Sequence, residues 1–129
     1  MYKNLTILNV AGLMARHAGA RQIIVANNIA NADTPGFEAK TVESFSGWMA
    51  EKNNSFDMKS TRRLHLAPRT EQKLPTAVTD PNAKSEPNGN SVSLEMQTLT
   101  AVDVKQQHDK ALAIYKSGLS ILRSSLGRR

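Results

Sequence analysis

Three histidines, His17, His65 and His108, are the side chains best suited to acid–base or metal chemistry near neutral pH. They lie far apart in the sequence and lack the short spacings of metal-ligand motifs. Carboxylates are few, and the nearest pair in the C-terminal third, Asp103 and Asp109, falls on different faces of a helix. There is no cysteine, no Gly-rich phosphate loop, no His-Glu-x-x-His motif and no serine nucleophile elbow. The sequence therefore predicts no catalytic centre, metal site or cofactor site.

The N-terminal stretch carries the repeat of a long helix that packs against a partner. Apolar and small residues recur at alternating spacings of three and four, the pattern of a coiled-coil seam. A second apolar set, which includes Met14, Ala18 and Val25, widens this stripe. Gly12 and Gly19 each destabilise an isolated helix by about 1 kcal/mol relative to alanine, so the segment depends on packing for its order. The predicted seam positions are Leu5, Leu8, Gly12, Ala15, Gly19, Gln22, Ala26 and Ile29.

The C-terminal third repeats the same alternation over residues 94–126. Ser93 is a suitable N-cap, and Glu95 in the first turn and Arg123 near the end complement the helix dipole. The predicted seam positions are Leu94, Thr98, Ala101, Lys105, His108, Leu112, Tyr115, Leu119, Leu122 and Leu126. We therefore expect a mainly α fold, in which two long terminal helices pair as an antiparallel, coiled-coil-like hairpin around an irregular polar middle segment.

The N-terminal helix is expected to end in an asparagine-rich turn. Asn27, Asn28 and Asn31 have side chains that compete for backbone hydrogen bonds, which weakens a helix at this point. Pro35 sets φ for the second position of a β-turn, and Gly36 supplies the positive φ that the third position of a type II turn requires. The whole stretch reads Ala-Asn-Asn-Ile-Ala-Asn-Ala-Asp-Thr-Pro-Gly-Phe.

Residues 37–90 are expected to be irregular and partly flexible. A small apolar cluster that includes Val42, Phe45 and Trp48 predicts an extended piece followed by a short helix near residues 42–51. Four prolines follow and exclude a long helix, and the polar stretch before the C-terminal third buries too little apolar surface to order itself. The chain is thus divided into an N-terminal helix and turn, a middle segment and a C-terminal helix, over residues 1–36, 37–90 and 91–129.

The charge is basic, with 17 Lys and Arg against 11 Asp and Glu, and residues 1–32 contain no acid. Such charge could attract nucleic acid or an anionic membrane, but no recognition helix, zinc-finger spacing or aromatic-lined basic groove supports that interpretation. No apolar run approaches the roughly 20 residues of a membrane span. Arg16, His17 and Arg21 interrupt the apolar region that a cleaved secretory signal requires. We expect no nucleic-acid binding, no membrane insertion and no cleaved signal.

The asparagine-rich turn resembles the signature that follows the N-terminal helix in flagellar axial proteins, the family of rod and hook subunits. A second motif, Asn-Gly-Asn-Ser-Val-Ser-Leu-Glu at residues 88–95, resembles the start of the C-terminal helix in the proximal rod members of that family. Thr61 with His65-Leu66 and the stretch 114–122 are also similar, whereas residues 96–98 depart from the acid and methionine that usually follow Leu-Glu. The positions that carry the resemblance are Asn27, Asn28, Ile29, Asn31, Asp33, Thr34, Pro35, Gly36 and Phe37, and then Asn88, Gly89, Asn90, Val92, Leu94 and Glu95.

The resemblance implies a structural subunit of the bacterial flagellar basal-body rod, at its proximal end, rather than an enzyme. It implies passage through the flagellar type III export apparatus without a cleaved signal, and residence in the rod within the periplasm. It also implies self-assembly through the terminal helices, with contacts to other rod proteins and to the junction protein at the membrane ring. The expected assembly interface consists of Leu5, Leu8, Ala15, Gln22, Ile29, Leu112, Tyr115, Leu119, Leu122 and Leu126.

Two alternatives stay open on the sequence alone. The first is a sibling axial protein, either another proximal rod subunit or the junction protein itself, because such proteins share the turn motif. The second is a basic helical module for nucleic acid or membrane surfaces, for which binding would weaken steeply with salt.

Overall fold

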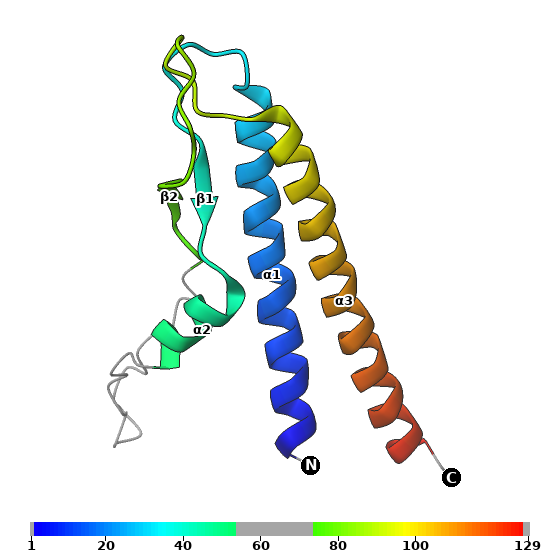
Figure 1. The fold of residues 1–129 in the computed structure, drawn as a ribbon. Helices are drawn as coiled ribbons and strands as arrows, with labels where there is room; N and C mark the ends of the chain where they lie inside the picture. Colours follow the sequence, from blue (N-terminus) through cyan, green and yellow to red (C-terminus); the bar gives the residue numbers. More distant parts are fainter. Residues whose placement is uncertain (1, 54–73, 128–129) are drawn as a thin grey trace, which may run out of the picture.

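The computed structural model describes residues 2–53 and 74–127. Two long helices dominate it, and the shorter elements lie between them in the chain (Figure 1). In order, the elements are α1 (Tyr2–Ala30), β1 (Lys40–Val42), α2 (Phe45–Asn53), β2 (Ala77–Thr79) and α3 (Leu94–Leu126). The helices α1 and α3 run antiparallel and pack against each other, so that both chain ends lie at one end of the hairpin and the turn at the other (Figure 1). The predicted mainly α hairpin is confirmed.

Both long helices begin and end where the sequence predicts, to within a few residues. The side chain of Ser93 accepts a hydrogen bond from the Met96 amide at 3.4 Å, which confirms it as the N-cap of α3. At the other end of α3, the amide of Gly127 donates to the Arg123 carbonyl at 2.8 Å. The last turn of α1 is closed by Asn31, whose side-chain amide donates to the Asn27 carbonyl at 2.8 Å.

The core of the hairpin is a seam of small side chains. Ala11, Ala18 and Val25 on α1 and Val104 and Ala111 on α3 are all buried. Small side chains let the two helix backbones approach closely, which larger residues in the same positions would prevent. Along each helix these buried apolar positions recur every seven residues, the heptad period that underlies the three-four alternation of the sequence.

The predicted register of this seam is wrong by one residue, because each buried position precedes a predicted one. The larger apolar side chains remain at the edge or outside: Leu112 is 38 % exposed and Leu126 is 74 % exposed. The predicted seam and interface residues with described side chains fall into two groups. The half-buried ones are Leu8, Gly12, Ala15, Gly19, Ala101, His108, Leu119 and Leu122. The exposed ones are Gln22, Ala26, Ile29, Leu94, Thr98, Lys105, Leu112, Tyr115 and Leu126. Leu5 lies in α1, but its side chain is outside those described.

The middle segment contains a two-stranded antiparallel sheet that the sequence did not predict. Lys40 pairs with Thr79 and Val42 with Ala77, and the Asp80 amide extends the pairing to the Ala39 carbonyl at 2.9 Å. The expected short helix is present as α2. The motif residues Thr61, His65 and Leu66 lie outside the described part of the chain.

The helix α2 is held against α1 by a buried histidine. His17 is 1 % exposed, and its Nε2 donates to the Glu43 carbonyl at 2.8 Å. Its ring stacks edge-on against Phe45, with centroids 5.5 Å apart, and lies 5.7 Å from the Trp48 ring. Burial lowers the pKa of His17, and the hydrogen bond to the Glu43 carbonyl opposes this shift. Burial thus favours the neutral form of His17, whose ring packs α1 against α2, a role that the sequence did not predict.

Candidate functional site

The two motifs that carry the family resemblance meet in space at the tip of the hairpin. The amide of Gly36 donates to the Asn88 carbonyl at 3.1 Å, and the amide of Ser91 donates to the Phe37 carbonyl at 3.0 Å. The Ser91 hydroxyl also accepts from the Ala39 amide at 2.8 Å. We call this contact between residues 27–39 and 88–95 the turn junction. It joins the end of α1 to the start of α3.

Asn90 is the central side chain of the turn junction and is 1 % exposed. Its Nδ2 lies 3.1 Å from the Asn31 carbonyl and 3.0 Å from the Thr34 carbonyl, and it also donates to the Ala32 carbonyl. Its Oδ1 accepts from the Val92 amide at 2.8 Å. One amide thereby bonds to three carbonyls of the turn that follows α1, of which those of Asn31 and Thr34 also accept a backbone amide. The motif asparagine fixes the direction in which the chain leaves α1.

Asn28, in the last turn of α1, also joins separate elements of the fold, and its side chain is fully buried. Its Oδ1 accepts from the Lys40 amide at 3.0 Å, and its Nδ2 donates to the Lys40 carbonyl at 2.7 Å. The side chain thus pairs with the edge of β1 as a neighbouring strand would. The same Nδ2 reaches Gln97 Oε1 at 3.2 Å, so that a single amide connects α1, β1 and α3.

Two glycines allow the two segments to touch. Gly36 has φ of 72° and Gly89 has φ of 80°, the left-handed region that favours glycine. A Cβ added at Gly89 would lie 3.3 Å from the Gly36 Cα, tighter than an ordinary contact. The amide of Phe37 donates to the Thr34 carbonyl at 3.3 Å, which confirms the predicted β-turn with glycine at its third position.

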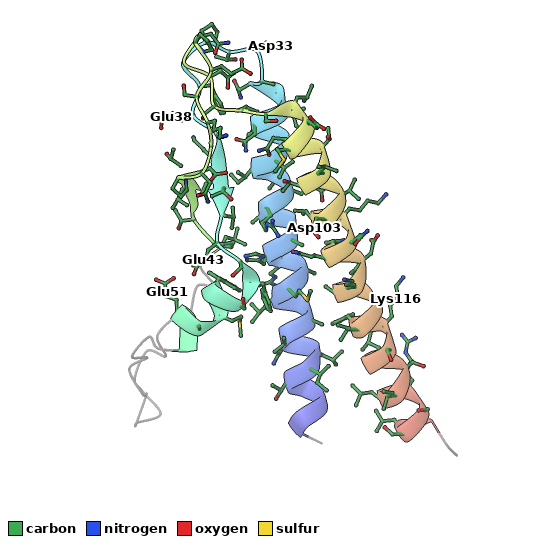
Figure 2. The ribbon with its side chains drawn as sticks, viewed as in Figure 1. Asp33, Glu38, Glu43, Glu51, Asp103 and Lys116 are labelled. Atoms are coloured by element: carbon green, nitrogen blue, oxygen red, sulfur yellow. The ribbon has the colours of Figure 1, made fainter. Side chains whose placement is uncertain are left out.

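The remaining motif residues divide into buried and exposed groups. Val92 is buried beneath the junction, whereas Asp33, Pro35, Leu94 and Glu95 are exposed. Figure 2 shows Asp33 at the tip of the hairpin, beyond the end of α1. The exposed members are available for contacts with other molecules, and the buried ones are fully used within the chain.

Several contacts were not predicted from the sequence. Arg21 Nη1 donates to Gln107 Oε1 at 2.9 Å, and Gln107 Nε2 donates to Asp103 Oδ2 at 3.2 Å, which braces α1 against α3. The buried roles of His17 and Asn28 were also missed. The only signal in the sequence was that a histidine and an asparagine interrupt an apolar helix, and this does not identify their partners.

An apolar groove lies between α1 and α3 in the half of the hairpin that holds the chain ends. Its volume is about 380 Å³. On α1 it is lined by Leu8, Ala11, Gly12 and Ala15, and on α3 by Ala111, Leu112 and Tyr115, together with Asn9, Leu13 and Arg16. Beside it, Leu8 covers Gly118, where an added Cβ would lie 2.8 Å from Leu8 Cδ2. Four predicted interface residues, Leu8, Ala15, Leu112 and Tyr115, therefore come together at the groove.

Among residues 2–53 and 74–127, no three His, Asp or Glu side chains gather as a metal site would require. Within the same ranges, no helix combines the length and apolar character needed to cross a membrane. The fold and its two motifs define the class of the protein, a helical hairpin that is closed by the two motifs and leaves large apolar side chains exposed on both long helices.

Comparison with known proteins agrees with this class. The sequence profile of the family described as "Flagella basal body rod protein" matches residues 10–37, which include most of α1 and the asparagine-rich turn. The flagellar basal body rod protein FlgB of Agrobacterium fabrum is 33 % identical over 115 residues, which cover 86 % of this chain and 85 % of that protein. The FlgB protein of Aeromonas hydrophila is 27 % identical over 108 residues, covering 82 % of this chain and 81 % of its own length.

The chain belongs to the FlgB family of flagellar basal body rod proteins. This confirms the resemblance inferred from the two motifs. Both relatives carry the FlgB description, and neither comparison favours a sibling axial protein or a nucleic-acid or membrane module. The family is structural, which also confirms that the chain is not an enzyme.

Proposed function

We propose that this chain is a proximal rod subunit that assembles through the exposed faces of its two terminal helices. The observation that carries the proposal is the number of large apolar side chains that the isolated hairpin leaves in water. They include Ile7, Ile23, Leu99, Val102, Leu112, Ile114, Tyr115, Ile121 and Leu126, distributed on both long helices. Burial of these side chains against neighbouring molecules would remove a large apolar area from water and so favour assembly.

The partners that fit this proposal are other copies of the chain, the adjoining rod proteins and the junction protein at the membrane ring. Export through the flagellar type III apparatus, without a cleaved signal, suits helices whose order depends on packing. Gly12 and Gly19 weaken α1, and no side chain contacts the position of a Cβ at either glycine. These two positions are therefore open to a neighbouring subunit.

The proposed organisation keeps the three predicted segments. The described parts of residues 1–36 and 91–129 form the hairpin that packs in the rod, and the described parts of the middle segment, residues 37–53 and 74–90, lie beside it. The turn junction supports this division, because it fixes where the chain leaves α1 and where it enters α3. The position of β1 beside α1, with β2 paired to it, agrees with this division (Figure 1).

The test is complementation of a strain from which the gene has been deleted. We expect the deletion strain to lack rods and not to swim, and the wild-type chain to restore both. Ile23→Glu and Ile121→Glu place a charge on the exposed helix faces, because these side chains are 64 % and 56 % exposed. They should abolish motility while leaving the circular dichroism of the purified chain unchanged. Val78→Glu is the matched control, because Val78 is an exposed apolar residue of β2, away from both terminal helices.

Two outcomes would contradict the proposal. A deletion strain that still assembles rods would show that the chain is not a rod subunit. Full motility with both glutamate variants would show that the exposed helix faces do not mediate assembly. A loss of motility with Val78→Glu alone would instead place the important surface on the sheet.

A further inference from the structure

The groove between α1 and α3 lies in a basic half of the hairpin. Residues 110–127 of α3 contain Lys110, Lys116 and Arg123 and no acid, and α1 contains no acid at all. Arg16 lines the groove itself. Figure 2 shows Lys116 on this half of α3. A segment that binds here must offer apolar side chains to the groove and negative charge around them.

The opposite half of α3 has this complementary chemistry. Within α3, residues 94–104 contain Glu95 and Asp103 and no base, and the first base of the helix is Lys105. On the first turns of α3, Glu95, Leu99 and Val102 follow each other at spacings of four and three and so share one face of the helix. Leu99 is 62 % exposed and Val102 is 58 % exposed, so this face is apolar, acidic and open.

We propose that the groove of one copy receives the acidic, apolar face of α3 from a second copy of this chain. The acidic face consists of Glu95, Leu99 and Val102, and the groove is centred on Gly12 and Leu112. The inference rests on the proposed function as an assembling subunit and specifies which surfaces meet.

The geometry makes this contact staggered rather than symmetric. Leu99 and Leu112 are thirteen positions apart on α3, which corresponds to about 20 Å along a helix. Two copies joined in this way are therefore shifted along the hairpin axis by about this distance, if their helices run parallel. Because the two surfaces are different, each copy keeps one of each free for a further copy, and such heterologous contacts generate open helical assemblies.

The absence of cysteine from the chain allows a direct test by disulfide trapping between two full-length variants. Gly12→Cys places a thiol in the groove without a clash, since nothing lies within 4 Å of a Cβ there. Leu99→Cys places one on the acidic face. Mixing the two variants under mild oxidation, with one of them tagged for size, should produce the mixed dimer much faster than either variant produces its own dimer. Ser85→Cys, exposed in the loop before α3, replaces Leu99→Cys in the control mixture.

Charge reversal gives an independent readout in the same mixtures. Glu95→Lys on the acidic face should slow formation of the mixed dimer by roughly three- to fivefold, and Lys116→Glu on the groove side should do the same. Glu51→Lys, on α2, is the control reversal and should have no effect. Combining Glu95→Lys in one copy with Lys116→Glu in the other should recover part of the rate.

A mixed dimer that forms no faster than the Ser85 control, while the wild-type chain still restores rods and motility, would overturn the inference and leave the proposed function intact. Failure of the wild-type chain to restore rods would overturn the proposed function itself. If Gly12→Cys in assembled rods is trapped by a different protein and not by a second copy, the occupant proposed here is wrong.

Discussion

Asn90→Ala is expected to destabilise the hairpin severely, although the residue lies far from the seam of α1 and α3. The wild-type side chain is 1 % exposed, donates to the carbonyls of Asn31, Ala32 and Thr34, and accepts from the Val92 amide. Its two N–H groups and one oxygen make about three net hydrogen bonds, each contributing about 1 kcal/mol, and truncation removes all of them. The Asn31 and Thr34 carbonyls keep a backbone amide as donor, so the added cost of an unpaired group falls mainly on the buried Val92 amide. We expect a loss of about 2–4 kcal/mol, a large fraction of the stability of a small domain.

The assay is urea unfolding of the purified chain, followed by circular dichroism at the helical band. With a slope of about 1–3 kcal/mol per molar urea, the midpoint should fall by about 1–2 M without a change in slope. Asn27→Ala is the matched control, because Asn27 is an exposed asparagine in α1 whose replacement should stabilise the helix slightly. Asn90→Asp separates hydrogen bonding from side-chain volume, since it keeps the Val92 bond but places a carboxylate against three carbonyls.

At neutral pH, Asn90→Asp should therefore be at least as unstable as Asn90→Ala, and acid should partly restore it by protonating the carboxylate. A midpoint for Asn90→Ala within the range of the Asn27 control would show that the carbonyls of the turn find other partners. Wild-type stability for Asn90→Asp at neutral pH would refute the donor role of Asn90 directly.

Three further predictions follow from the other buried and capped positions. Burial lowers the pKa of His17 in the folded chain below its usual value of 6.5. Just below pH 6.5 the unfolded chain therefore binds more protons than the folded chain. The packing of α2 on α1 should be most stable above pH 6.5 and should weaken as the pH falls through the lowered pKa. The fluorescence of Trp48, the single tryptophan, should report this acid transition, and His17→Phe should remove it; the same transition in the variant would contradict the assignment. Gly89→Ala should lower the free energy of unfolding by about 1–2 kcal/mol, because Gly89 has a positive φ. Gly12→Ala should raise it by up to about 1 kcal/mol, because Gly12 lies inside a helix with open space at its Cβ position. Urea unfolding measures both values, and equal effects would contradict the prediction. Ser93→Ala should cost about 1 kcal/mol by the same method, with Ser93→Asp near wild type, and an unchanged midpoint for the alanine variant would show that the cap is not important.

The helices were predictable because their signals are local. The alternation of three and four, the Ser93 cap and the Pro35-Gly36 turn each depend on residues within one or two helical turns of each other. The register of the seam was not predictable in the same way. Periodicity identifies an apolar stripe on a helix, but it does not show which residues of the stripe are buried against the partner helix. That depends on how closely the two backbones approach, and in this hairpin the buried alanines set that distance.

The candidate site was predicted as two motifs but not as one contact. Asn28 and Asn31 read as residues that weaken a helix end, and this is correct for Asn31. Nothing local indicates that Asn28 is buried against β1 and Gln97, because those partners are brought together only by the completed fold. The pairing of β1 with β2 was missed for the same reason, since three-residue strands carry almost no periodic signal.

The bonds of the turn junction impose an order of events on the growing chain. Asn90 reaches carbonyls 56 to 59 positions earlier, and the seam positions on α3 come later still. A ribosome must therefore synthesise well past the middle of the chain before the end of α1 can acquire its final shape. Until then α1 lacks both the hydrogen bonds from Asn90 and its packing against α3. Every shorter nascent chain therefore has no closed hairpin. The helix α3, which is synthesised last, is thus the element that fixes the structure of α1, which is synthesised first.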